Sequence, residues 1–205
     1  MGAPPKHREN LLINAISLFR RQGFSGTGIA EILSASGAPK GSLYHYFPNG
    51  KDQIAAEALD LVRETVAGKL RDAARHAANA NELVRQFSAA LQEGLHHSEY
   101  REGCPVAAII VDAASSTPEL CQAGSKIYQE WGGIIASKIE SDGVPHDRAQ
   151  TLGLFVVSTL HGALLVSRAC RDTHPLIDAT IELESILTDA AAAARHSGGH
   201  HANTH

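Results

Sequence analysis

The sequence has few of the features that mark secreted, membrane-spanning or disulfide-linked proteins. Its three cysteines, Cys104, Cys121 and Cys170, are an odd number without CxxC spacing, which indicates reduced thiols in a cytosol. No run of about 18 uninterrupted apolar residues is present, so we expect no membrane span. The N-terminus, MGAPPKHREN, lacks the apolar run of a signal peptide. Together these absences predict a cytoplasmic protein that does not act in a membrane.

The short motifs of common enzymes and cofactor sites are also missing. The chain contains no GxSxG, HExxH, P-loop or Rossmann glycine pattern, so we predict that it is not an enzyme and needs no cofactor. No Cys/His set has the spacing of a structural zinc site, so we expect no metal. Two alternatives stay open. A metal sensor would use some of the 12 histidines, such as His96-His97, His200-His201 and His205, and a redox sensor would use a cysteine.

Aromatic residues make up only 5% of the chain, whereas apolar residues of all kinds make up 43% of its 205 residues. Apolar positions recur at helical spacing and no convincing strand is visible, which predicts an all-α fold of about nine helices. Three short helices are expected first, one from Pro5 to Gly23, one capped by Thr27 and ended by Gly37, and one opened by Pro39 and broken at Pro48. Six longer helices are expected near residues 51–76, 81–97, 106–114, 118–141, 146–171 and 175–195.

Charge is distributed unevenly along the chain. Residues 1–51 carry six basic and two acidic side chains, a net charge of +4, while residues 52–205 carry 12 basic and 20 acidic ones, a net charge of −8. The whole chain is acidic, at −4, but its N-terminal part is basic. A basic N-terminal part on an acidic body indicates that the first part binds an anion such as nucleic acid, with a chance distribution of charge as the alternative.

The stretch GAPKGSLYHYF, residues 37–47, ends in polar rings that a core segment does not need. Two short helices with glycine in the turn form a helix-turn-helix, whose second helix enters the DNA major groove. Leu43 and Phe47 would hold that helix inward, Ala38 and Gly41 would allow close approach, and Lys51 would add charge at the next helix N-terminus. The opposite face would present to phosphates and base edges Pro39, Lys40, Ser42, Tyr44, His45 and Tyr46. The alternative is an aromatic interface between helices.

The longer stretch GFSGTGIAEILSASGAPKGSLYHYFPNGKDQI resembles the N-terminal DNA-binding domain of TetR-type transcriptional repressors. The shared features, spread over about residues 8–56, are Gly23-Phe24, Thr27, Ile29-Ala30, Gly37-Ala38, Gly41, Tyr44-His45-Tyr46-Phe47 and Lys51. The segment Pro48-Asn49-Gly50-Lys51 is one residue longer than in many members. Together with Gly103-Cys104-Pro105-Val106-Ala107, it resembles the branch related to the lincomycin-resistance repressors.

This resemblance implies an all-α homodimer with a DNA-binding domain at residues 1–50 and an effector-binding and dimerisation domain at residues 51–195. We expect residues 196–205 to form a disordered tail, because they contain nothing apolar to bury. By carry-over, the DNA-contacting positions are Thr27, Gly28, Pro39, Lys40, Gly41, Ser42, Tyr44, His45, Tyr46 and Lys51. Base edges are expected at Lys40 and Gly41, and phosphates at Thr27, Ser42, Tyr44, Tyr46 and Lys51, while His45 fits either role.

The predicted effector-binding and dimerisation domain, residues 51–195, carries fewer residues that indicate a particular function. Residues 152–170 are apolar on most faces, and we expect them to pair with residues 176–194 and a symmetry mate as a four-helix dimer bundle. Gly153, Gly162 and Ala163 would permit close approach of another helix, and a monomeric core is the alternative. The candidate lining of an apolar effector pocket is Phe87, Ile109, Tyr128, Trp131, Ile135, Phe155, Thr159 and His161, with simple core packing as the alternative for each.

The function expected from the resemblance is repression at a palindromic operator, because two identical heads about 34–36 Å apart read two half-sites. A small hydrophobic effector would favour a form with altered head separation and so release the DNA. The helix at residues 51–76 would join the head to the pocket wall. A redox- or metal-responsive regulator of the same fold is the alternative.

Overall fold

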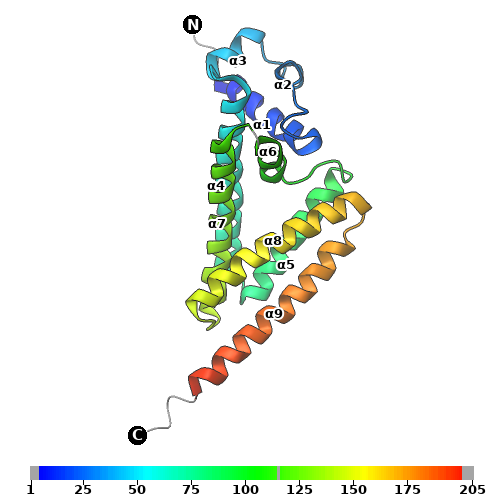
Figure 1. The fold of residues 1–205 in the computed structure, drawn as a ribbon. Coiled ribbons are helices and arrows are strands. Elements are labelled where there is room, and N and C mark those ends of the chain that lie inside the picture. The colour runs from blue at the N-terminus through cyan, green and yellow to red at the C-terminus, as the bar shows by residue number, and fades with distance from the viewer. Residues whose placement is uncertain (1–4, 115, 200–205) are drawn as a thin grey trace. The chain divides into compact units, whose positions relative to one another are not determined.

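The computed structural model describes residues 5–114 and 116–199, which form nine helices and no strand (Figure 1). The predicted all-α fold is therefore confirmed over these residues. The helices are α1 (Pro5–Gln22), α2 (Ile29–Ser36), α3 (Lys40–Tyr46), α4 (Gly50–His76), α5 (Ala80–His97), α6 (Pro105–Ala113), α7 (Pro118–Ser141), α8 (His146–Cys170) and α9 (His174–Gly199). The end of α9 lies beyond the expected end near residue 195, and the rest of the expected tail, residues 200–205, lies outside the described residues.

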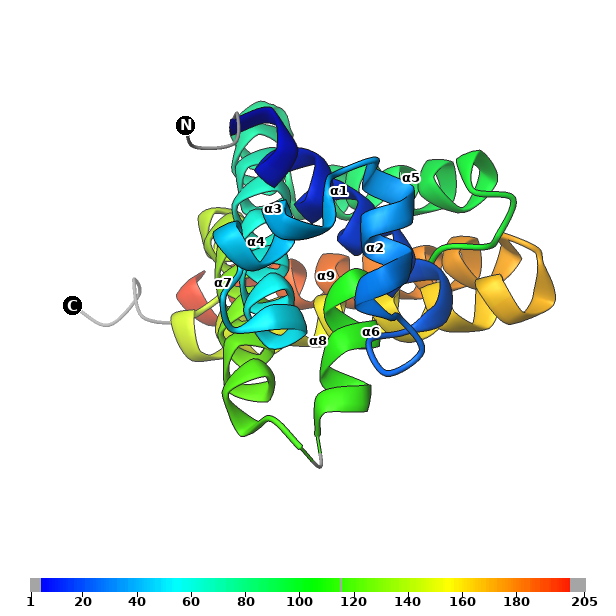
Figure 2. The same cartoon turned by 90° about the horizontal axis from the view of Figure 1, so that it is seen from above.

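The chain divides into two compact units that do not follow the expected boundary after residue 50. Among the described residues, the first unit contains 5–65, 101–114 and 116–126, and the second contains 66–100 and 127–199. The segment from Arg101 to Lys126, expected in the body, thus belongs to the same unit as the helix-turn-helix. Its α6 packs against α1 (Figure 2).

The core of the first unit is built on α1, which packs against α2, α3 and α6. Large side chains of α1, α2, α3 and the C-cap of α3 are fully buried there, namely Leu11, Phe19, Ile32, Leu43 and Phe47. The first helix ends where Gly23 adopts a φ of +83°, a left-handed conformation that glycine tolerates better than other residues. The inward placement of Leu43 and Phe47 is as the sequence predicts.

The start of α2 differs from the prediction that Thr27 caps it. Gly28 is the N-cap, and its backbone N–H donates to a carboxylate oxygen of Glu31 at 2.9 Å, which lowers the pKa of Glu31. The Thr27 side chain turns inward instead and donates to the carbonyl oxygen of Gly23 at 2.6 Å. Its hydroxyl therefore closes the turn between α1 and α2. Similarly, Pro39 is the N-cap of α3 rather than its first residue.

In the second unit, α8 packs against α5 and α9, and it crosses α7 closely. A Cβ added at Gly153 would lie 2.2 Å from the Gly132 carbonyl oxygen, so the crossing depends on the missing side chain. The expectation of close approach at Gly153 is confirmed, whereas nothing lies within 4 Å of a Cβ built at Gly162. Among the described helices, α8 is long and apolar enough by composition to cross a membrane, but its inner face is core packing.

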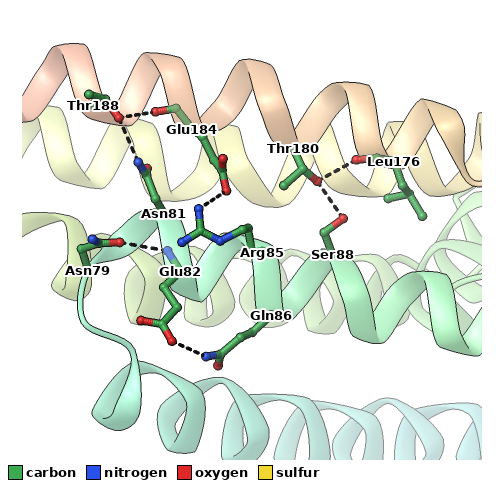
Figure 3. A network of polar contacts seen from close by, with 10 residues as sticks. All are labelled: Asn79, Asn81, Glu82, Arg85, Gln86, Ser88, Leu176, Thr180, Glu184 and Thr188. Carbon is green, nitrogen blue, oxygen red and sulfur yellow. Dashed lines mark hydrogen bonds and ion pairs between the residues drawn. The ribbon is translucent and has the colours of Figure 1, made fainter.

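Polar side chains fix the register between α5 and α9 (Figure 3). Asn81 bonds Thr188 at 2.9 Å, and Arg85 pairs with Glu184 at 2.8 Å. At the next turn of the two helices, the hydroxyl oxygens of Ser88 and Thr180 lie 2.7 Å apart and both residues are buried. Because the partners advance by three or four residues on each helix, they lie on one face and align the two helices antiparallel. The Ser88–Thr180 pair is buried, so a slipped register would leave its hydroxyls without partners, whereas the other two contacts lie at the exposed edge of the helix pair.

Candidate nucleic-acid interface and aromatic cluster

The outward face of α3 carries groups suited to DNA. With Leu43 and Phe47 buried, Lys40 and His45 are exposed, and Tyr44 is 52% exposed. Pro39, Gly28 and Gly41 are also exposed, and a Cβ built at Gly41 meets nothing within 4 Å. Tyr46 is half-buried, with its ring edge-on to the ring of His45 at 5.0 Å. This face therefore offers an ammonium, an imidazole and a phenol to an incoming anion.

Two of the expected phosphate contacts are turned away from solvent. Ser42 is only 7% exposed, and Thr27 is 1% exposed with its hydroxyl bonded to Gly23. Their spacing in the sequence is compatible with an outward face, but the packing of α1 against α2 and α3 buries them. Both residues support the helix-turn-helix from within, and their side chains present little surface to DNA.

Lys51 occupies an internal position in the same unit. Its Nζ donates to the carbonyl oxygens of Phe24 at 3.0 Å and Thr27 at 3.2 Å, and it lies 4.4 Å from the centroid of the Phe24 ring. The side chain thus ties the first turn of α4 to the turn between α1 and α2. We expected Lys51 at a phosphate, but in this arrangement its donors are used within the protein.

The three arginines of α1 are paired with carboxylates of the same unit. Arg8 pairs with Glu57, and Arg20 and Arg21 both pair with Glu102. Lys40 forms no ion pair with any other described residue and is the cation that the α3 face presents. The +4 charge of the N-terminal residues therefore overstates the charge available to DNA. No local signal in the sequence pointed to Glu102, because it lies 81 residues from Arg21.

Four of the eight candidate effector residues come together as a ring cluster in the second unit. The rings of Trp131 and His161 stack at 5.8 Å with 23° between their planes, and Tyr128 stands edge-on to both at 5.7 and 5.1 Å. Phe87 of α5 completes the cluster, 6.4 Å from His161. We call these four residues the ring cluster. It joins α5, α7 and α8 at one place.

Two polar atoms of the ring cluster are fixed by their surroundings. The Nδ1 of His161 lies 2.9 Å from the carbonyl oxygen of Val157, and since a carbonyl can only accept, Nδ1 carries hydrogen. Trp131 is 1% exposed, and its Nε1–H has no hydrogen-bond partner among residues 5–114 and 116–199. An unsatisfied buried donor costs about 1–3 kcal/mol. Such a donor is a candidate contact for a ligand that brings an acceptor.

The remaining candidate effector residues are dispersed. Ile109 and Ile135 are fully buried, and Thr159 is half-buried. Ile109 belongs to the first compact unit, whereas the ring cluster lies in the second. Phe155 is 45% exposed on the same side of α8 as other exposed apolar residues, so it lines the outer surface of its unit.

The sensing alternatives find little support in the side chains. No group of three or more His, Cys, Asp or Glu that could hold a metal ion occurs within residues 5–114 and 116–199. His200, His201 and His205 lie outside that range. None of the three cysteines, all of which lie within it, forms a disulfide. They are distributed over the N-cap of α6, α7 and the end of α8, so no two of them share an element.

Comparison with protein families matches both parts of the chain. Residues 11–58 match the family described as bacterial regulatory proteins, tetR family. Residues 80–182 match the family described as transcriptional regulator LmrA/YxaF-like, C-terminal domain. The two matches together span the helix-turn-helix and most of the body.

Individual relatives agree with these matches. The chain is 34% identical over 186 residues to the uncharacterized HTH-type transcriptional regulator Rv0196 of Mycobacterium tuberculosis, covering 88% of this chain and 93% of that protein. It is 32% identical over 170 residues to the HTH-type transcriptional regulator LmrA of Bacillus subtilis, covering 83% and 90%. A solved TetR regulator from Legionella pneumophila shares the fold, with a TM-score of 0.81 at 19% identity and coverage of 91% and 99%.

These relatives are transcriptional regulators and not enzymes, as the absence of catalytic motifs predicts. The extra residue before Lys51 and the Gly103-Cys104-Pro105 segment were the two sequence signs of the lincomycin-resistance branch, and the match to LmrA confirms that assignment. The chain therefore belongs to the TetR family of DNA-binding transcriptional regulators, with an LmrA/YxaF-like C-terminal domain.

Proposed function

We propose that this regulator is a cytoplasmic repressor that binds a palindromic operator as a homodimer and is released by a small hydrophobic effector. The observation that supports operator binding is the outward face of α3, where Lys40, Tyr44 and His45 are exposed above the buried Leu43 and Phe47. Because Thr27, Ser42 and Lys51 are engaged within the protein, we assign direct recognition to the exposed residues and to Gly41.

Replacement of Lys40 and Tyr44 by alanine tests this interface. A duplex selected by the wild-type protein from a random library serves as the operator, and affinity is measured by fluorescence anisotropy at several salt concentrations. Each of the two heads then loses the Lys40 charge, so the slope of log affinity against log salt should become shallower by up to about 2, while the loss of Tyr44 lowers the affinity without changing the slope. Lys126→Ala, which removes an exposed lysine of α7, is the matched control. An unchanged operator affinity in a folded Lys40→Ala, Tyr44→Ala variant would contradict the assignment.

Dimerisation is supported by apolar side chains that α8 and α9 leave exposed. They are Leu154, Phe155, Leu165, Val166, Ile177 and Ile181, between 37% and 67% exposed. A surface of this kind marks a protein contact. We assign this apolar surface of α8 and α9 to the dimer bundle. Phe155 is therefore assigned to the dimer contact and not to the effector site. Sedimentation should show twice the chain mass of 21.7 kDa, and Leu165→Asp should shift the protein to the monomer. A wild-type protein that sediments as a monomer at micromolar concentration refutes this.

For the effector site we propose the ring cluster, where the Nε1–H of Trp131 would donate to an acceptor on an otherwise apolar compound. Trp131 is the only tryptophan of the chain, so its fluorescence reports on this site without a label. A panel of apolar compounds with and without a carbonyl or ether oxygen is titrated, and operator release is followed in parallel. An inducer should both change the emission of Trp131 and weaken operator binding.

The variant Trp131→Phe separates the effector site from operator binding. It keeps a ring in the cluster and removes the donor, so operator affinity should stay at the wild-type value while the inducer loses potency. Ile139→Val, a small change at a buried residue of the same helix that is not a candidate effector contact, controls for altered packing. If an inducer acts with equal potency on Trp131→Phe, the effector binds elsewhere.

A further inference from the structure

The segment that begins at Glu102 is held against the end of α1 by a set of contacts within the first compact unit. The side-chain carboxylate of Glu102 bonds Arg20 and Arg21, the backbone of Gly103 bonds Arg20, and Asp112 bonds the turn that follows α1. We call Glu102, Gly103 and Asp112 the brace. None of these three residues was a candidate for DNA or effector binding in the sequence.

Glu102 is the most buried partner of its ion-pair network. Its Oε1 accepts from the Nε of Arg21 at 2.9 Å and from the hydroxyl of Ser17 at 3.1 Å, while its Oε2 lies 3.0 Å from an Arg20 nitrogen. The Glu102 side chain is 12% exposed, against 34% for Arg20 and 54% for Arg21. Charge-assisted bonds from two arginines to separate oxygens fix both the position and the rotation of the carboxylate.

The ionisation of Glu102 agrees with this geometry. Partial burial acts to raise the pKa of its carboxyl, but the hydrogen bond and charge of Arg21, the charge of Arg20 and the Ser17 hydroxyl outweigh it, so the pKa is lowered. The group is therefore a carboxylate throughout the neutral range. Two arginines and a hydroxyl that share one carboxylate form a network, which stabilises more than an isolated surface ion pair does.

The backbone of the brace also satisfies the end of α1. The Gly103 N–H donates to the Arg20 carbonyl oxygen at 3.0 Å, and the Nε of Arg20 donates to the Gly103 carbonyl oxygen at 3.0 Å. A carbonyl in the last turn of a helix has no partner within the helix, so this contact supplies one. Arg20 is thus held through both its backbone and its side chain.

Asp112, on α6, holds the next turn. Its Oδ2 accepts the backbone N–H of Ser25 at 2.8 Å, and a Cβ added at Gly23 would lie 2.7 Å from the same oxygen. The brace therefore contacts the last turn of α1 and the loop that leads to α2. Since α2 and α3 pack on α1, the placement of α3 follows from the placement of these residues.

From these contacts we propose that Glu102 is a positioning residue for operator recognition, holding the helix-turn-helix in the pose in which α3 reads DNA. The proposal rests on operator reading by α3, set out above. Because Arg20 and Arg21 are paired with Glu102, we assign them no phosphate contact. Loss of Glu102 should therefore weaken the recognition of a specific sequence while leaving general attraction to DNA unchanged.

The test compares the full-length wild type with Glu102→Gln, which removes the charge and keeps the shape. Affinities for the selected operator duplex and for a random-sequence duplex of equal length are measured over a range of salt. We expect the operator affinity to fall about tenfold, with the random-duplex affinity and both salt slopes unchanged. Glu130→Gln, which breaks the ion pair with Arg71 in the second unit, is the matched control and should leave both affinities unchanged.

A double-mutant cycle with Arg21→Gln tests whether the effect passes through the ion pair. The double variant should bind the operator no more weakly than Glu102→Gln alone. The reason is that Arg21→Gln removes the Arg21–Glu102 contact, which Glu102→Gln has already removed. Circular dichroism and the thermal midpoint confirm that each variant is folded at the assay temperature, so that a loss of both affinities is traced to unfolding. In that case Glu102→Asp, which retains the charge on a shorter side chain, is measured in the same way and should recover most of the operator affinity.

Several outcomes overturn the proposal. An unchanged operator affinity in folded Glu102→Gln removes any positioning role. Higher affinity for the random duplex with a steeper salt slope shows that Glu102 only competes with phosphates for Arg20 and Arg21. Failure of Glu102→Asp to recover the affinity that Glu102→Gln gives up shows that a carboxylate at residue 102 does not by itself support operator binding, so the loss does not come from the missing charge. The proposed α3 interface is judged separately, by Lys40→Ala and Tyr44→Ala.

Discussion

The crossing of α7 and α8 makes a sharp prediction for the variant Gly153→Ala. An alanine Cβ at this position would lie 2.2 Å from the Gly132 carbonyl oxygen, 2.8 Å from the Ala136 Cβ and 2.9 Å from the Ala136 nitrogen. Two of these three atoms are backbone and cannot rotate away. Real Cβ atoms essentially never approach other atoms closer than 3.0 Å, so the two helices must separate.

Two effects of opposite sign determine how much Gly153→Ala changes the free energy of unfolding. Alanine favours a helix over glycine by about 1 kcal/mol, which stabilises the variant. Overpacking typically costs about 1–3 kcal/mol and more where only backbone can move, and here a separation of roughly 1 Å also loosens neighbouring contacts. We therefore expect a net loss of about 2 kcal/mol. In a chain of this length that corresponds to a fall of about 4–8 °C in the thermal midpoint.

Gly133→Ala supplies the matched control, because a Cβ at that neighbouring position meets nothing within 4 Å. It should gain up to about 1 kcal/mol from helix propensity alone. Both variants are unfolded by heat and by urea at one fixed protomer concentration, since dimerisation makes stability depend on concentration. If Gly153→Ala is as stable as Gly133→Ala, the two helices do not cross as closely as described.

Three further predictions concern other parts of the molecule. Gly41→Ala should preserve stability, because its Cβ meets no protein atom, yet weaken operator binding about tenfold or more in an anisotropy assay if DNA approaches α3 closely. Thr180→Val should cost about 1–2 kcal/mol in urea unfolding by removing a partner of buried Ser88, and adding Ser88→Ala should cost less than the sum of the two single changes. Because the folded-state pKa of Glu102 is lowered, its stabilisation is present above the ordinary value of 4.5 and lost as pH falls through the folded-state pKa; acid titration of Glu102→Gln should show a smaller loss over that range.

The placement of the helices could be predicted from local spacing, and the family from the resemblance of residues 23–54 to TetR-type DNA-binding domains. Helical periodicity and the glycine and proline positions located every helix to within a few residues, and the inward Leu43 and Phe47 followed from an i, i+4 pair. The Tyr-His-Tyr-Phe run and Lys51 at their fixed spacing pointed to a DNA-binding domain. These features depend on neighbours within one or two turns of a helix, so the local sequence is enough to predict them.

The direction of individual polar side chains could not be predicted in this way. Thr27 fits the pattern of an N-cap, but the hydroxyl bonds back to Gly23 because the packing of α1 and α2 encloses it. Lys51 fits the pattern of a phosphate contact, but two carbonyl oxygens of the α1–α2 turn lie within its reach. In both cases a partner supplied by the folded chain competes with the role that local spacing suggests.

The sequence by itself thus determined the helices, the family and the residues that α3 carries. Only the tertiary structure decided which charges remain available to DNA and what holds the helix-turn-helix in place. Arg21 and Glu102 are 81 residues apart, and Gly153 and Gly132 belong to different helices. Pairings at such distances depend on how the helices pack, and no periodicity within a single helix encodes them.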